Sequence, residues 1–184
     1  LLPKNVNFEK WAVIACDQFT SQLEYWQRVR ENVGEAVSTL NLVFPEAELN
    51  VDRAQRIKSI NENMAKYLVE DIFTEYKDSY VYVERTLKNG VVRKGIVGVI
   101  DLEQYDYNAD SKSAIRATEQ TVLERIPPRV EIRRNASMEL PHVLLLFGDE
   151  KERIIEPLTA QKVELLKIYD FDLMEGGGHI EGYL

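Results

Sequence analysis

Apolar residues recur every three or four positions in two segments of the chain, which is the spacing of one face of an α-helix. Residues 52–70 show this pattern most clearly, with charged or amide residues between the apolar ones. A second helix is expected to begin at Ser21, where Glu24 completes a capping box, and to end at Gly34. In the helix at residues 52–70, the positions predicted to face the core are Ala54, Ile57, Ile60, Met64, Tyr67 and Leu68. In the helix at residues 21–34, they are Trp26, Val29 and Val33. We expect the helix at residues 52–70 to pack on a sheet.

The strongest strand signal is a hairpin between residues 79 and 102. Residues 79–86 (SYVYVERT) are rich in β-branched and aromatic side chains, and residues 91–102 (VVRKGIVGVIDL) form the return strand. Between them, Asn89-Gly90 predicts a type I′ turn with positive φ angles. Gly95 and Gly98 inside the return strand indicate a bulge or a close backbone approach.

Shorter apolar runs predict further strands. Three of them are residues 11–16, residues 39–44, and residues 142–147, whose unbroken apolar run is typical of a central strand. The others are a short strand at residues 153–157 and a final hairpin of residues 165–173 and 179–184 around a glycine-rich turn.

Strands mixed with helices indicate an α/β or α+β fold, in which a mixed β-sheet with hairpins is packed by helices. The 184 residues, 45% of them hydrophobic, suffice for one domain with a proper core. We expect residues 1–184 to form a single domain. Because the chain starts at Leu1 and stops directly after a predicted strand, we also expect it to be the N-terminal fragment of a longer protein.

The charge balance narrows the possible partners. A net charge of -8 argues against nucleic acid and anionic membrane, since both attract positively charged surfaces. No apolar run approaches the roughly 18 residues of a membrane span. Cys16 is the single cysteine, which excludes an internal disulfide and a cysteine zinc site and favours the cytoplasm. A small-molecule ligand is the expected partner, and the oligomeric state stays open.

The most distinctive polar feature is the charged stretch of residues 115–134, IRATEQTVLERIPPRVEIRR. We expect a helical turn over residues 118–124, a break at Pro127-Pro128, and a second helix over residues 129–136, because proline suits a first helical turn. Carboxylates and guanidiniums at this density can form a solvated lattice of ion pairs. They can equally form an acid/base and phosphate-recognition site, and composition alone leaves both interpretations open.

Glu119 is the candidate general base in this stretch. Such a base must be held close to the hydroxyl that it deprotonates, and Thr118 or Thr121 can orient it. We therefore expect Glu119 to be partly buried beside one of these threonines. Arg125 and Arg129 can bind phosphate oxygens through bidentate hydrogen bonds, and we expect them to point at phosphate rather than at Glu119.

Other chemical signals are weaker. His142 and His179 are far apart in sequence and neither lies in a metal-binding motif, so no histidine-based metal site is expected. His142 opens an apolar run, where a structural imidazole is the simpler interpretation. The glycine run at residues 176–178 is followed by neither Lys-Ser/Thr nor a helix signal, which makes it a flexible turn and not a phosphate loop. Asp17 follows a predicted strand, where it can bind a substrate amine or cap a turn.

Five blocks of the sequence resemble, in order, the domain-of-unknown-function family 1015, a bacterial and archaeal family sometimes labelled SerC-like or ParB-like. They cover nearly the whole chain and read WAVIACDQFTSQLEYW, STLNLVFPE, YVYVERTLKNGVVRKGIVGVIDLEQYDY, IRATEQTVLERIPPRVEIRRNASMELPH and YDFDLMEGGGHIEGYL. Many members read Pro-Tyr-Asp in the first block, which matches Asp17. Their central block reads Pro-His-Glu-x-Thr, which matches Glu119 and Thr121, whereas Ala117 and Thr118 replace the proline and histidine.

The resemblance implies a function. Longer members continue into a block that looks like the nucleotide-binding motif of the ParB/sulfiredoxin superfamily, which includes free-serine kinases. The full-length protein is then expected to be a nucleotide-dependent phosphotransferase acting on a small hydroxy or amino acid such as serine, with ATP or ADP and Mg as cofactors. The fragment alone should be inactive. The roles implied are base for Glu119, substrate contacts for Asp17, Gln18 and Thr121, and phosphate contacts for Arg125 and Arg129.

Two alternatives remain beside this enzyme. One is a non-catalytic module that binds or senses a small ligand, and the other is a structural interaction domain. The enzyme interpretation requires Asp17, Glu119 and Arg129 to share one cleft, whereas the structural interpretation does not.

Overall fold

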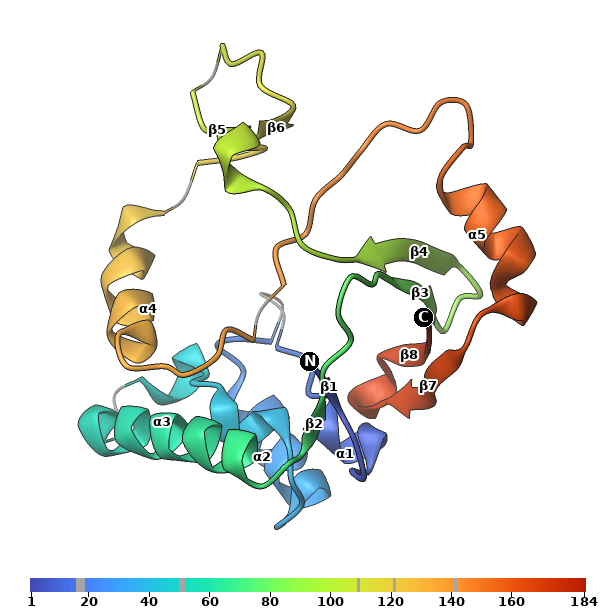
Figure 1. Ribbon diagram of the computed structural model, residues 1–184. Helices are drawn as coiled ribbons and strands as arrows, with labels where there is room; N and C mark the ends of the chain where they lie inside the picture. Colours follow the sequence, from blue (N-terminus) through green and yellow to red (C-terminus); the bar gives the residue numbers. More distant parts are fainter. Residues whose placement is uncertain (16–18, 50–51, 109, 121, 141) are drawn as a thin grey trace.

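Helices occupy most of the first 70 residues and the longest strands lie after residue 80 (Figure 1). The computed structural model describes residues 1–15, 19–49, 52–108, 110–120, 122–140 and 142–184. The α-helices are α1 (Phe8–Trp11), α2 (Leu23–Val33), α3 (Arg53–Val69), α4 (Ile126–Arg133) and α5 (Ile155–Gln161). The strands are β1 (Leu2–Pro3), β2 (Phe73–Thr74), β3 (Val81–Thr86), β4 (Val92–Val97), β5 (Tyr105–Asp106), β6 (Ile115–Arg116), β7 (Lys167–Leu173) and β8 (Gly178–Tyr183).

Short 3-10 helices link these elements: η1 (Thr39–Leu42), η2 (Glu46–Glu48), η3 (Leu102–Gln104), η4 (Leu123–Arg125), η5 (Lys162–Glu164) and η6 (Met174–Gly176). Helices and strands are largely segregated along the chain, so the expected α+β class is confirmed. None of the described helices is both long and apolar enough to cross a membrane.

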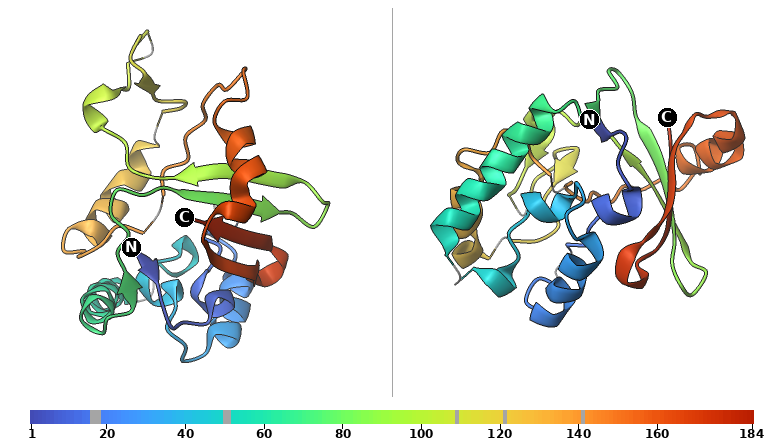
Figure 2. Two further views of the ribbon diagram at one scale, coloured as in Figure 1. Left: turned by 45° about the vertical axis from the view of Figure 1, so that its right-hand side comes forward. Right: turned by 90° about the horizontal axis from the view of Figure 1, so that it is seen from below.

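The central element is a four-stranded antiparallel sheet in the order β4-β3-β8-β7. Both predicted hairpins are confirmed as parts of it, because β3 pairs with β4 and β7 pairs with β8. The return strand β4 ends at Val97, however, and not at residue 102 as predicted. Figure 2 shows α5 on one side of this sheet and the N-terminal helices on the other. Two small sheets stand apart from it: β1 and β2 pair antiparallel, and β5 and β6 pair parallel.

The turn between β3 and β4 lies where it was predicted but has a different geometry. Gly90 has a φ of +82°, whereas Asn89 is not among the residues with positive φ. The backbone N–H of Gly90 donates to the carbonyl of Leu87 (2.9 Å), so the loop is a type I turn followed by a left-handed glycine and not a type I′ turn. The register of β4 is unbroken through Gly95, and Gly98 is the close approach, since a Cβ there would lie 2.5 Å from Tyr80 Cδ1.

The buried face of α3 is the predicted one, with two exceptions, Ala54 and Leu68. Ile57, Ile60, Met64 and Tyr67 are buried, and the charged side chains between them, Lys58, Glu62 and Lys66, are exposed. Ala54 and Leu68, in the first and last turns of α3, were predicted to face the core but are exposed, Leu68 by 42%. The predicted packing of α3 on a sheet is wrong: its apolar face meets Trp11, Leu42 and Ile72.

Helix α2 builds a second core cluster. Trp26, Val29 and Val33 are buried as predicted, together with Tyr25, and Gly34 ends the helix with a φ of +58°. The helix begins at Leu23 with Gln22 at its N-cap position and no side-chain cap, so the predicted capping box does not form. Met174 from the β7–β8 turn packs into this cluster and joins the N-terminal helices to the sheet.

Four strand predictions are wrong. Residues 8–11 form α1, which Asn7 caps by accepting from Lys10 N–H (3.2 Å), and residues 12–15 have no regular structure. The segment predicted as a strand at 39–44 contains η1, whose cap is the Ser38 hydroxyl. In both cases a hydrogen bond from the backbone to a polar capping side chain favours a helical turn over the strand that the apolar run predicted. Residues 153–157 lead into α5, and residues 142–147 have no strand partner within the described residues.

Candidate functional site

The residues of the predicted phosphotransferase site are only partly described by the structure. Glu119 lies in the irregular segment between β6 and η4, Arg125 ends η4, and Arg129 lies in α4. All three side chains are exposed, so the expected partial burial of Glu119 is wrong. The physical reason is that the whole segment from Arg116 to Gln120 faces solvent. The remaining predicted contacts lie outside the described residues: Asp17, Gln18 and Thr121.

Helix α4 gives the charged stretch two different faces. The predicted break at Pro127-Pro128 is wrong, because both prolines fall in the first turn of α4, where their missing N–H groups are not needed. Arg125 directly precedes α4 and its backbone is also right-handed helical, so Arg129, four residues later, lies on the same side. Within the described part of the chain, neither arginine takes part in an ion pair.

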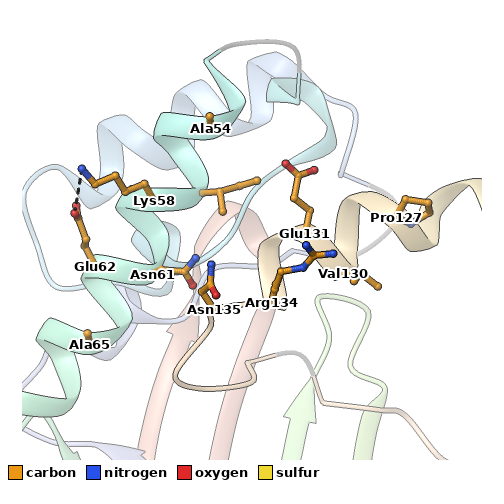
Figure 3. A pocket seen from close by; sticks show the side chains of 11 residues that line it. Ala54, Lys58, Asn61, Glu62, Ala65, Pro127, Val130, Glu131, Arg134 and Asn135 are labelled. Carbon is orange, nitrogen blue, oxygen red and sulfur yellow. Dashed lines mark ion pairs between the residues drawn. The ribbon is translucent and has the colours of Figure 1, made fainter.

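The other face of α4 borders a groove against α3 (Figure 3). The groove has a volume of about 980 Å³ and is lined on the α4 side by Val130, Glu131 and Arg134. An ion pair between Arg53 and Glu131 ties the two helices together. The arginine that reaches this groove is thus Arg134, which the sequence did not single out as a phosphate contact.

Amide groups from both sides meet in the groove. Figure 3 shows the side chains of Asn61 and Asn135 pointing toward one another. Asn61 Oδ1 is buried and has no hydrogen-bond partner among the described residues. Lys58 and Glu62 form an ion pair at the rim (3.7 Å). A buried acceptor without a donor is costly, so rotation of the Asn61 amide toward the groove, where a ligand can donate to its oxygen, would be favourable.

A second polar site covers one face of the four-stranded sheet. Side chains alternate along a strand, so one face of β7 carries Tyr169 and Phe171, which stack against Phe8 of α1 (centroids 6.1 and 5.4 Å apart). We call the opposite face, which α5 and η5 cover, the ionic face. It comprises Tyr82, Glu84, Lys162, Lys167, Asp170, Asp172, His179, Glu181 and Tyr183.

Glu84 is the buried centre of the ionic face, at 7% exposure. Its carboxylate accepts from Lys162 Nζ (2.6 Å) and from the Tyr82 hydroxyl (2.7 Å). Burial alone raises the pKa of Glu84, but the hydrogen bonds from Lys162 and Tyr82 and the charges of Lys162 and Lys94 outweigh it and lower the pKa. Burial also raises the pKa of Tyr82 to about 12, which keeps its hydroxyl a donor.

The open end of the ionic face lies on β7 and β8. Glu181 accepts from Lys167 Nζ (2.7 Å) and from the Tyr183 hydroxyl (2.8 Å), and these bonds lower the pKa of Glu181 to about 2. His179 lies between two carboxylates, with Nδ1 2.8 Å from Asp172 Oδ1 and Nε2 2.9 Å from Asp170 Oδ1. The hydrogen bond with Asp172, followed by the charge of Asp170, raises the pKa of His179. The sequence carries no spacing signal for this cluster, because cross-strand pairing brings its residues together.

The fold and these sites define an α+β protein with a two-faced antiparallel sheet and a separate helical groove. The chain belongs to the family described as a protein of unknown function (DUF1015), whose model matches residues 2–183. The resemblance found in the sequence is therefore confirmed at the level of the family. No curated protein and no solved structure matches the chain.

Proposed function

We propose that this chain is part of a nucleotide-dependent phosphotransferase, ParB/sulfiredoxin-like and free-serine-kinase-like, which acts on a small hydroxy or amino acid. The observation that carries the proposal is the pair of exposed arginines on one side of α4, Arg125 and Arg129. Neither has a carboxylate partner among the described residues. Other arginines of the chain do pair with carboxylates: Arg28 with Glu175, Arg53 with Glu131, and Arg133 with Glu139.

Unpaired guanidiniums on consecutive helical turns suit a phosphate group, because each can donate two parallel hydrogen bonds to its oxygens. ATP or ADP with Mg would supply the phosphate in the full-length protein. No nucleic acid or membrane partner is proposed, and the location proposed is the cytoplasm.

Glu119 has the role of general base in this proposal. Its exposure means that the bound substrate has to cover it, since a base acts efficiently only within hydrogen-bond reach of the hydroxyl and shielded from water. Asp17, Gln18 and Thr121 are the proposed substrate contacts.

The test is phosphoryl transfer by the full-length protein from ATP or ADP, with Mg, to a panel of hydroxy and amino acids that includes L-serine. Glu119→Gln should lower transfer by about 100-fold or more while leaving the melting temperature unchanged. Glu124→Gln is the matched control, because it removes another exposed carboxylate of the same stretch and should keep activity. Full activity of the Glu119 variant would eliminate it as the base.

The second candidate is a non-catalytic module that binds a small ligand in the groove between α3 and α4. The unpaired Asn61 Oδ1 favours it. The charges lining the groove balance, with Lys58 and Arg134 against Glu62 and Glu131, which suits a zwitterionic or uncharged polar ligand.

Calorimetry with amino acids and dipeptides tests this module directly. Asn61→Ala should abolish binding, whereas Gln55→Ala on the exposed side of α3 should not affect it. Binding without any phosphoryl transfer by the wild type would favour the module over the enzyme.

A further inference from the structure

The β7–β8 hairpin places four potential metal ligands on two cross-strand pairs that are neighbours on one face of the sheet. Asp170 pairs with Glu181 across the strands, and Asp172 pairs with His179. Residues two apart on a strand point to the same side, so all four side chains lie on the ionic face. Directly opposed residues have Cβ atoms about 5 Å apart, within the reach of side chains that share one ion.

The spacing of the donor atoms fits a single small cation after modest movement. One ligand atom each from Asp170, His179 and Glu181 lies within 4.8 Å of the other two. In a tetrahedral zinc site with metal–ligand bonds of about 2.1 Å, the ligand atoms lie about 3.4 Å apart. The three side chains are on the partly open end of the sheet, where rotation about their terminal bonds can close this difference.

Asp172 orients the imidazole of His179 for this role. It lies against Nδ1 (2.8 Å), while Nε2 faces Asp170 (2.9 Å). Metal-binding histidines typically donate their second ring N–H to a carboxylate, which fixes the tautomer and directs the other nitrogen at the metal. Asp172 is thus placed outside the ligand trio and holds the ring.

The ammonium of Lys167 lies between two of these carboxylates. Lys167 Nζ contacts Asp170 and lies 2.7 Å from Glu181. Metal binding would displace the Lys167 ammonium from between the two carboxylates. In its present position between the carboxylates, Lys167 Nζ also lies 5.5 Å from the centre of the Tyr183 ring.

We propose that Asp170, His179 and Glu181 bind a divalent transition-metal ion, with Asp172 as the positioning residue. One imidazole and two carboxylates suit zinc, and three protein ligands leave a fourth position for water. This site is independent of the proposed phosphotransferase residues, because none of its ligands belongs to the 115–134 stretch.

The test is calorimetric titration of the protein with Zn²⁺, with the thermal melting temperature measured in parallel. Wild type should bind one ion and melt at a higher temperature in its presence. His179→Ala should weaken binding by about 100-fold or more, since even loss of an orienting partner usually costs 10–100-fold. Asp172→Asn should cost about 10-fold or more while the stoichiometry stays at one. His142→Ala, the other histidine, should bind as wild type does.

Titration with Co²⁺ adds a signature that a purely structural role would not produce. Wild type should show the visible absorption bands of tetrahedral cobalt, and His179→Ala should lack them. If His179→Ala does not fold, the double variant Asp170→Asn, Glu181→Gln is titrated in its place. It keeps the shapes of both side chains and removes two anionic ligands, so it should bind zinc more weakly. Unchanged zinc affinity in the folded variants, or no binding by wild type at millimolar zinc, would overturn the proposal.

Discussion

At the scale of single residues, the ionic face depends on Glu84, a carboxylate that is almost fully buried and yet ionised. Burying a charge costs free energy unless it is paired and hydrogen-bonded. Lys162 and Tyr82 satisfy both requirements, and Lys162 also reaches Glu181 (3.6 Å). Removing Lys162 or Tyr82 therefore leaves the buried charge of Glu84 without one of the groups that stabilise it.

Lys162→Met should lower the free energy of unfolding by about 2 kcal/mol. This loss is smaller than the roughly 3–5 kcal/mol expected when one partner of a fully buried ion pair is removed, because Lys162 is partly exposed to solvent. Chemical denaturation measures the change. Lys58→Met, which breaks the exposed pair with Glu62, is the control and should cost only about 0.3 kcal/mol. Equal effects of the two substitutions would contradict the assignment of Glu84 as the buried centre.

The lowered pKa of Glu84 also predicts a pH dependence. A carboxylate whose pKa is lower in the folded than in the unfolded chain stabilises the fold above the unfolded value, here 4.5. That contribution is lost as the pH falls through the folded pKa. Urea denaturation between pH 7 and pH 3 should therefore show a falling stability below about pH 4.5, and Glu84→Gln should flatten this fall. An unchanged slope in the variant would assign the acid sensitivity to other carboxylates.

At the scale of secondary-structure elements, periodicity predicted α2 and α3, each of which buries one apolar face, whereas strand composition around turn residues predicted both long hairpins. The elements that it missed are short. In α1 and η1 the deciding signals were the capping residues Asn7 and Ser38, which apolar patterning does not include. Capping decides whether a short helix forms, because most backbone N–H groups of a single turn have no partner within the helix and depend on a cap.

Ile60→Ala should lower the free energy of unfolding by about 2–5 kcal/mol, because the side chain is 0% exposed and its removal leaves a cavity in the core of α3. Leu68→Ala on the same helix is the matched control. Its side chain is 42% exposed, and the substitution should cost less than about 1 kcal/mol. Similar losses in both variants, measured by denaturation, would mean that the buried face is wrongly assigned.

Gly90→Val should destabilise the domain by about 1 kcal/mol or more, because a β-branched residue is strained at a φ of +82°. Gly95→Val is the control: this glycine lies in β4 without a positive φ, and a Cβ there meets no atom within 4 Å. Valine favours strands, so we expect no loss of stability at position 95. A melting temperature unchanged by Gly90→Val would exclude the left-handed glycine from the turn.

At the scale of the whole molecule, the most unusual feature is the apolar segment at residues 142–147. Its sequence predicts a central strand, but the structure leaves Val143, Leu144 and Leu146 more than 80% exposed. A strand forms only where another strand offers hydrogen bonds, and no described strand pairs with this segment. Exposed apolar runs of this kind promote association.

Replacing Leu144 and Leu146 with Asp should therefore reduce aggregation of this chain without lowering its melting temperature. Light scattering during heating and calorimetry measure the two quantities. Val29→Asp is the contrasting variant, because this side chain is 0% exposed and the substitution should unfold the chain. A large fall in melting temperature for the Leu144 and Leu146 variant would show that the segment is packed.

The sequence by itself determined the fold class, the long helices, both hairpins and the family of this chain. Each of these follows from patterns that are local in sequence or repeated along it, such as the apolar face of α3 and the glycine of the β3–β4 turn. Local patterns suffice where one element buries one face.

Only the tertiary structure decided which polar side chains meet. The register of β7 and β8 places His179 beside Asp170 and Asp172, and the packing of η5 against the sheet brings Lys162 to Glu84, 78 residues away. The rotation of α4 about its axis likewise places Arg134 in the groove against α3, and not Arg125 or Arg129. These contacts depend on strand register and helix rotation, which are set by long-range packing and leave no periodic signal in the sequence.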